Sequence, residues 1–229
     1  MGTFKQLYSD IKKNGELLEK ERQSWKCPNL KPEDFLLLLK NFGSLHTREK
    51  CAGTNFSIDK YNQDVIRQLY FYLIGDKINC KLDLYRGIYL MGAFGSGKTV
   101  LLKTFLEVQD YVTRHVTTMI HSKMLSDNIY AKGIIDLSRK PLFIDDVGRE
   151  NLEDTDWGKK IKPFTDLIAI RYENSALTNA TSNFRIESLA GDEKHKGYGT
   201  YITSRMEEMF NVITLPSPNR RKKKEYEAK

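Results

Sequence analysis

The sequence predicts an α/β protein built on a five-stranded parallel sheet that is flanked by helices. From residue 87 onward, short apolar runs alternate with longer amphipathic runs, which is the pattern of parallel strands joined by crossover helices. A glycine-rich turn lies between the first such strand and the helix that follows it. The chain has 229 residues, of which 40% are hydrophobic and 29% charged, a composition typical of one principal globular domain.

The elements follow from the period of the apolar residues. A helix is expected over residues 58–74, because apolar side chains recur there at helical spacing and Gly75 follows where a helix normally stops. Further helices are expected over residues 98–109, 122–131, 157–172 and 201–210. The expected strands are residues 87–91, 114–120, 141–145, 176–182 and 211–215.

The polar start of the chain is expected to form a short helical extension, residues 1–50. A second apolar stretch begins after Pro32, and residues 42–54, which contain two glycines and mixed charges, are expected to form a connector. The domain proper then covers residues 51–219, and a basic tail covers residues 220–229.

The cellular setting is expected to be the cytoplasm. Three cysteines lie far apart, without a CxxC pair or a neighbouring histidine, which argues against a disulfide framework and a structural zinc site. No run of about 20 apolar residues is present, so no membrane-spanning helix is expected. The first residues also lack the apolar block of a secretion signal.

The strongest motif is Gly92-Ala-Phe-Gly-Ser-Gly-Lys-Thr99, which matches GxxxxGK[ST] between a predicted strand and a predicted helix. Glycines let backbone N–H groups converge on a triphosphate, and the N-terminus of a helix favours the anion. In such a loop Lys98 reaches the β and γ phosphates, and the Thr99 hydroxyl coordinates Mg²⁺. The alternative is a glycine-rich turn that binds nothing. We expect ATP to be bound by Gly92, Ala93, Phe94, Gly95, Ser96, Gly97, Lys98, Thr99 and Val100.

Two adjacent carboxylates end the predicted strand 141–145. At the carboxyl edge of a parallel sheet, Asp145 is in a position to hold Mg²⁺. The next side chain along a pleated strand points to the other side, and Asp146 is the candidate for orienting or deprotonating the attacking water. The alternative is that both residues merely begin a loop. A second acid favours hydrolysis over phosphoryl transfer to a small molecule, because a kinase needs only the metal-holding carboxylate.

The stretch Leu-Phe-Ile-Asp-Asp-Val-Gly-Arg-Glu150 resembles the acidic motif of AAA+ ATPases, in particular the DnaC-type helicase-loader and IstB-type branch. The resemblance extends from about Phe56 to Arg221, and the order of the motifs is more specific than any one of them. It implies a P-loop NTPase fold with little or no C-terminal lid, since only 14 residues follow Leu215. The chain departs from the family pattern at Asp146, where many members have Glu.

The resemblance implies three further site residues. Asn183 stands where the family has its sensor 1 residue, which contacts the γ phosphate or the lytic water; otherwise it only terminates a strand. Arg205 stands where an arginine reaches the neighbouring subunit's γ phosphate, so that activity requires a homo-oligomer; otherwise it pairs with Glu207 or Glu208. Arg220, slightly favoured over Arg221, stands where the sensor 2 arginine lies; otherwise both belong to a solvated tail.

Two basic segments raise the possibility of single-stranded DNA binding. Of the formal net charge of +7, a large part lies in residues 220–229, which contain six basic and two acidic residues. Residues 157–164 combine three lysines with two aromatic residues, although a helix with a buried apolar face is the stronger explanation of this stretch. By analogy with loaders, the N-terminal extension is the candidate for docking onto a replicative helicase.

The function that these expectations describe is that of an AAA+ ATPase that loads a replicative helicase or assists DNA replication. An IstB-like transposition ATPase would share every motif. A P-loop kinase acting on a small metabolite is the alternative from another class and would act as a monomer. A third possibility is a nucleotide-gated binding module with negligible turnover.

Overall fold

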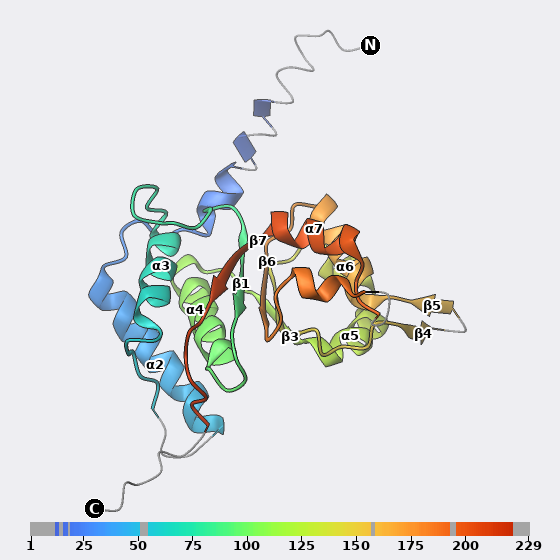
Figure 1. Cartoon of the computed structure of the whole chain (residues 1–229). Coiled ribbons are helices and arrows are strands. Elements are labelled where there is room, and N and C mark those ends of the chain that lie inside the picture. Colours follow the sequence, from blue (N-terminus) through green and yellow to red (C-terminus); the bar gives the residue numbers. More distant parts are fainter. Residues whose placement is uncertain are drawn as a thin grey trace, which may run out of the picture.

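The computed structural model describes residues 12–13, 16–17, 19–50, 55–156, 159–192 and 196–221. Its centre is a five-stranded sheet in the order β2-β3-β6-β1-β7, in which every neighbouring pair is parallel (Figure 1). The predicted α/β fold and its parallel sheet are therefore confirmed. The strands are β1 (Gly87–Met91), β2 (Thr118–His121), β3 (Leu142–Val147), β6 (Thr178–Ser182) and β7 (Phe210–Thr214).

Helices cover both faces of the sheet and make a three-layered molecule (Figure 1). Ile88 and Leu90 of β1 pack with the helices on one face, whereas Tyr89 between them packs with those on the other. This alternation places each residue of a central strand in one of two separate cores. The first face carries α2 (Pro32–Lys50), α3 (Gln63–Ile74) and α4 (Lys98–Thr113), and the second carries α5 (Leu125–Lys132), α6 (Pro163–Glu173) and α7 (Thr200–Met209).

The expected connector over residues 42–54 is wrong for its first part, because α2 continues to Lys50. Gly43, which favoured a break in the helix, has a packing reason: a Cβ at this position would lie 2.5 Å from Cγ of Phe56. On the same helix Phe35 and Leu39 are buried in one core with residues of α3 and α4. The part of the expected extension that forms α2 is therefore packed against α3 and α4 on one face of the sheet.

The expected helix over residues 157–172 is also wrong in its first part. The chain forms an antiparallel hairpin, β4 (Asp154–Asp156) and β5 (Lys159–Ile161), and α6 begins only at Pro163. Proline disfavours helical backbone in the residue before it but fits the first turn of a helix, so the helix starts there. Phe164 is buried as expected for a core face, whereas Trp157 lies outside the described residues.

A short segment before α2 is anchored to the far end of α4. The Trp25 ring stacks on His115 with centroids 3.9 Å apart, and Gln109 Nε2 donates to the Trp25 carbonyl at 3.0 Å. Lys26 Nζ lies 3.3 Å from the centre of the Tyr72 ring and, within the described part of the chain, finds no hydrogen-bond acceptor. Burial lowers the pKa of Lys26 to about 7. None of the helices in the described ranges is long and apolar enough to cross a membrane.

Candidate functional site

The glycine-rich loop leaves the carboxyl end of β1 and enters α4, as the motif predicts. Gly95 and Gly97 have φ angles of 75° and 94°, a left-handed conformation that suits glycine. Ser96 Oγ is fully buried in the loop and, among the described residues, has no hydrogen-bond partner. A buried hydroxyl without a partner costs free energy.

Lys98, the first residue of α4, connects the loop to the end of β6. Its Nζ donates to the carbonyl of Ala93 at 3.0 Å and to Oδ1 of Asn183 at 2.8 Å. Asn183 in turn donates from Nδ2 to Oδ1 of Asp146 at 2.8 Å. Burial lowers the pKa of Lys98, while the nearby Asp146 and Asp145 carboxylates act in the opposite direction. The three predicted residues Lys98, Asn183 and Asp146 thus form one hydrogen-bonded chain.

Asp145 is held by two hydroxyl groups. Its Oδ1 accepts from Thr99 Oγ1 at 2.7 Å and from Thr181 Oγ1 at 2.5 Å. A hydroxyl beside a carboxylate is an oxygen donor set of the kind that Mg²⁺ takes from a protein, with phosphates and water completing its shell. The described residues contain no cluster of three or more His, Cys, Asp or Glu that would hold a metal ion without such help. Thr99 and Asp145 therefore fit a magnesium ion that arrives with a phosphate ligand.

The backbone at Asp146 differs from the simple pleat expected from the sequence. Asp146 has φ 62°, and the register between β3 and β6 shifts between Ile144 and Val147. The bulge breaks the alternation of side chains. As a result Asp145 accepts from Thr99, and Asp146 is linked to Lys98 through Asn183. The turn is fixed by hydrogen bonds from Ser122 Oγ to the Asp146 carbonyl at 2.8 Å and from the Asp146 amide to Thr181 Oγ1 at 2.9 Å.

Sequence reasoning missed three residues of this cluster. Thr181 and Ser122 support the two carboxylates, but their contacts depend on strand register and on the bulge. Arg149 lies within the acidic motif, but the motif by itself indicates no role for it. Its Nε is 3.8 Å from Asp146 Oδ2, and its guanidinium lies 4.9 Å from the centre of the exposed Phe94 ring. The only sequence signal for its place beside Asp146 is that residue 149 is an arginine close to two carboxylates.

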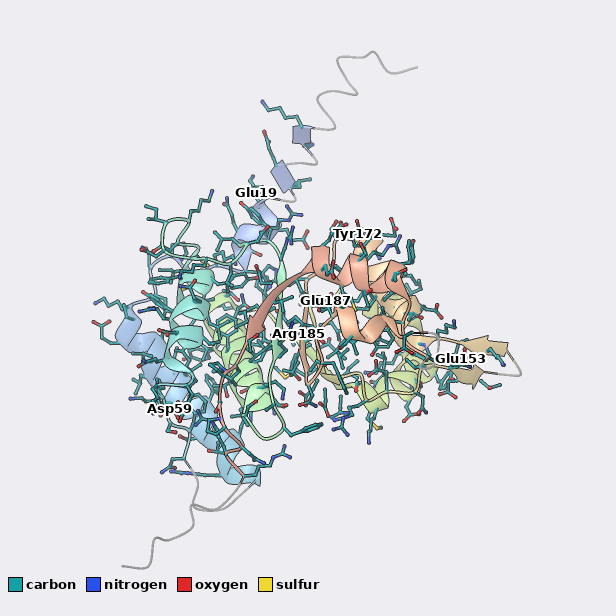
Figure 2. All side chains as sticks on the ribbon, viewed as in Figure 1. Glu19, Asp59, Glu153, Tyr172, Arg185 and Glu187 are labelled. Carbon is teal, nitrogen blue, oxygen red and sulfur yellow. The ribbon has the colours of Figure 1, made fainter. Side chains whose placement is uncertain are left out.

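Arg205 lies elsewhere. Its guanidinium donates to Glu173 Oε1 at 2.8 Å and lies between the rings of Tyr172 and Tyr201, at 4.7 and 4.1 Å from their centres. The ion pair is thus made with α6 and not with Glu207 or Glu208. Figure 2 shows Tyr172 and Asp59 on opposite sides of the molecule. Asp59 marks the side of the glycine-rich loop, because it pairs with Arg220, which donates to the Ser96 carbonyl of that loop. The side chains of Lys98, Thr99, Asp145, Asp146 and Asn183 form what we call the Lys98 cluster. The structure does not bring Arg205 to the Lys98 cluster of its own chain.

Arg220 lies beside the glycine-rich loop but makes no hydrogen bond to the Lys98 cluster among the described residues. Its guanidinium pairs with Asp59, with NH1 2.8 Å from Oδ2 and NH2 3.0 Å from Oδ1. Its Nε donates to the Ser96 carbonyl at 3.2 Å. The Arg221 amide donates to Asn219 Oδ1 at 3.0 Å.

Comparison with known proteins supports the fold. No family model and no curated protein matches this sequence. Among solved structures, the DnaC helicase loader is similar over 71% of this chain and 94% of its own, with 20% identity and a TM-score of 0.53. DnaI is similar over 74% of this chain and 89% of its own, with 23% identity and a TM-score of 0.50.

A third similar structure is AMPPCP-bound DnaA from Aquifex aeolicus, which covers 71% of this chain and 48% of its own, with 16% identity and a TM-score of 0.50. The sheet order and the glycine-rich loop after β1 agree with these likenesses. The chain therefore has the fold of the DnaC helicase loader, of DnaI and of DnaA, with a P-loop after β1.

Proposed function

We propose that this protein binds ATP with Mg²⁺ and hydrolyses it as an AAA+ ATPase. The observation that carries the proposal is the convergence of Lys98, Thr99, Asp145, Asp146 and Asn183 in two short hydrogen-bonded networks at one edge of the sheet. These residues come from three segments that are far apart in the sequence. Their side chains are a cation, a hydroxyl, two carboxylates and an amide, which is the set that phosphoryl chemistry requires.

Each residue has a distinct task. Amides of the glycine-rich loop and the Lys98 ammonium bind the phosphates. Thr99 and Asp145 would hold Mg²⁺, which would supply positive charge beside the phosphate oxygens. Asp146 accepts the proton of the attacking water. Asn183 orients Asp146 and Lys98 toward the same phosphate, since it is hydrogen-bonded to both.

The fold likeness supports a role in DNA replication. We propose that the protein acts as a replicative helicase loader or as a replication accessory ATPase, because the DnaC helicase loader and DnaI resemble it over most of its length. Single-stranded DNA is a proposed ligand, since a DnaA with the same fold is solved bound to AMPPCP and single-stranded DNA. An IstB-like transposition role shares the same site. A pull-down that recovers a hexameric helicase favours loading, whereas recovery of a transposase favours the IstB-like role.

Catalysis is proposed to involve a homo-oligomer, with Arg205 of one subunit acting at the site of another. Its position away from the Lys98 cluster of its own chain supports a role in trans. A metabolite kinase would have a specific activity independent of protein concentration. Measuring ATPase activity over a wide range of protein concentration tests this: a constant specific activity would contradict the role of Arg205.

Separate measurements of binding and turnover test the site itself. Lys98→Ala is expected to weaken binding of ATP, because the main cation of the loop is lost. Asp146→Asn is expected to bind ATP normally and to lose turnover by about 10²-fold or more. Normal turnover in Asp146→Asn would contradict the assignment of the water-activating residue.

A further inference from the structure

The segment that follows β7 lies directly against the glycine-rich loop. The Arg220 amide donates to the Gly95 carbonyl at 2.9 Å, and Arg220 Nε donates to the carbonyl of Ser96 at 3.2 Å. Asn219 is so close that a Cβ on Gly95 would lie 2.0 Å from its Oδ1. The loop and residues 219–220 are therefore in close contact, with no space for an added side chain between them.

Asp59 completes this arrangement from a third part of the chain. Its carboxylate binds the Arg220 guanidinium through both oxygens, and Oδ1 also accepts from the Tyr61 amide at 2.9 Å. Burial alone would raise the pKa of Asp59, but the hydrogen bonds from Arg220 and from backbone amides bring that pKa below its usual value. Figure 2 shows Asp59 at the end of the molecule to which the chain runs after β7.

The contacts of Arg220 lie on the carbonyl side of the loop. A phosphate binds to loop N–H groups, whereas Arg220 binds the carbonyl oxygens of Gly95 and Ser96. Arg220 Nε also donates to Ser217 Oγ at 2.8 Å, and NH1 and NH2 both lie within hydrogen-bond distance of Asp59. These contacts are all with protein oxygens, which is the arrangement of a residue that supports the loop.

We propose that Asp59 and Arg220 are positioning residues that hold the glycine-rich loop in its phosphate-binding shape. This inference rests on the proposed nucleotide binding and assigns Arg220 a different role from that of a γ-phosphate sensor. The guanidinium that Asp59 holds donates to the Ser96 carbonyl, beside the Gly95 carbonyl that the Arg220 amide binds, and so helps to fix the direction of the loop amides before any ligand arrives. A loop that is already ordered loses less conformational entropy on binding, so affinity rises for every ligand that the loop takes.

The two roles predict different nucleotide dependences. A γ-phosphate sensor strengthens binding of ATP but not of ADP, and its loss slows turnover at saturation. A positioning pair acts on the loop as a whole, so its loss weakens ATP and ADP equally and leaves kcat at saturating ATP nearly unchanged. Removal of either partner breaks the same contact, so the two substitutions are not additive.

The test compares Asp59→Asn, Arg220→Gln and the double variant with Arg67→Gln as a matched control, because Arg67 also pairs with an aspartate, Asp64, but on the exposed surface of α3. Dissociation constants for ADP and for a non-hydrolysable ATP analogue are measured with Mg²⁺ by calorimetry. Both single variants are expected to weaken both ligands by about 10-fold, because each loses a charge-assisted hydrogen-bonded pair. The double variant is expected to match the single ones, and Arg67→Gln to match the wild type. Arg220→Lys, which keeps the charge but not the bidentate geometry, should recover part of the affinity.

A second readout does not depend on nucleotide. Hydrogen exchange of the amides of residues 92–97 in the ligand-free protein should be faster in Asp59→Asn than in Arg67→Gln. Unchanged exchange, or an Arg220→Gln variant that weakens the ATP analogue alone, would overturn the positioning role. Failure of the proposed nucleotide binding looks different, because wild type and Lys98→Ala would then bind both nucleotides equally poorly.

Discussion

The backbone of Asp146 makes a prediction that separates folding from chemistry. A non-glycine residue in the left-handed region costs about 1–2 kcal/mol, but Asp and Asn are tolerated there better than other residues. At φ 62°, Asp146→Asn retains this tolerance and keeps an oxygen that accepts from Asn183 Nδ2. Asp146→Ala loses both advantages. Asp146→Gly loses only the side-chain oxygen, because glycine adopts positive φ freely.

The magnitudes follow from these contacts. For Asp146→Ala, backbone strain of about 1 kcal/mol and a lost hydrogen bond of about 1 kcal/mol add to roughly 2 kcal/mol. For a chain of this size, each kcal/mol lowers Tm by about 2–4 °C, so Asp146→Ala should melt about 6 °C below the wild type. Asp146→Gly should be destabilised by about half as much as Asp146→Ala. Asp146→Asn should melt close to the wild type.

The assay measures Tm and ATP turnover for the same three variants. All three should lose turnover by about 10²-fold or more, since none carries a carboxylate to accept the proton. Stability should therefore vary across the series while activity does not. Equal Tm values for the Ala and Gly variants would refute the backbone reasoning, and an active Asn variant would refute the chemical role.

Three further predictions concern other parts of the molecule. Because burial lowers the pKa of Lys26 to about 7, the unfolded chain binds more protons above this pH. The free energy of unfolding should therefore rise from about pH 7 to pH 9, by at most about 1.4 kcal/mol per pH unit, and rise less in Lys26→Met; parallel slopes in urea titrations would contradict this. Glu173→Gln frees Arg205 and should raise ATPase activity at low protein concentration, whereas Arg205→Ala should lower activity by about 10³-fold; equal rates in both would exclude the trans role. Deleting residues 222–229 removes basic charge and should weaken binding of single-stranded DNA and its salt dependence, with unchanged affinity for ATP in calorimetry.

The central strands and the glycine-rich loop could be predicted because their signals are local. The strand Gly87–Met91 has the predicted bounds, since an apolar run ending in a glycine turn leaves little choice of register. The order of the motifs along the chain then predicted which side chains meet. Lys98, Asp146 and Asn183 do meet, because parallel strands bring their carboxyl ends to one edge.

The remaining features depend on contacts between segments distant in sequence. Gly43 looks like a helix breaker until Phe56 is seen packed against it. The left-handed turn at Asp146 depends on register against β6, which no local pattern encodes. The partner of Arg220 is Asp59, 161 positions away, and tail-like composition gave no sign of that ion pair. The hairpin before Pro163 was missed because its lysines and apolar residues also fit a helix.

Helix α4 has a mechanical consequence. Its 16 residues form a rod about 24 Å long, with Lys98 and Thr99 at one end. Near the other end, Gln109 binds the Trp25 carbonyl, and His115, just past the helix, stacks on the Trp25 ring. A single helix therefore joins residues 22–27 to the start of the glycine-rich loop's helix, and a displacement of α4 along its axis would shift both ends together.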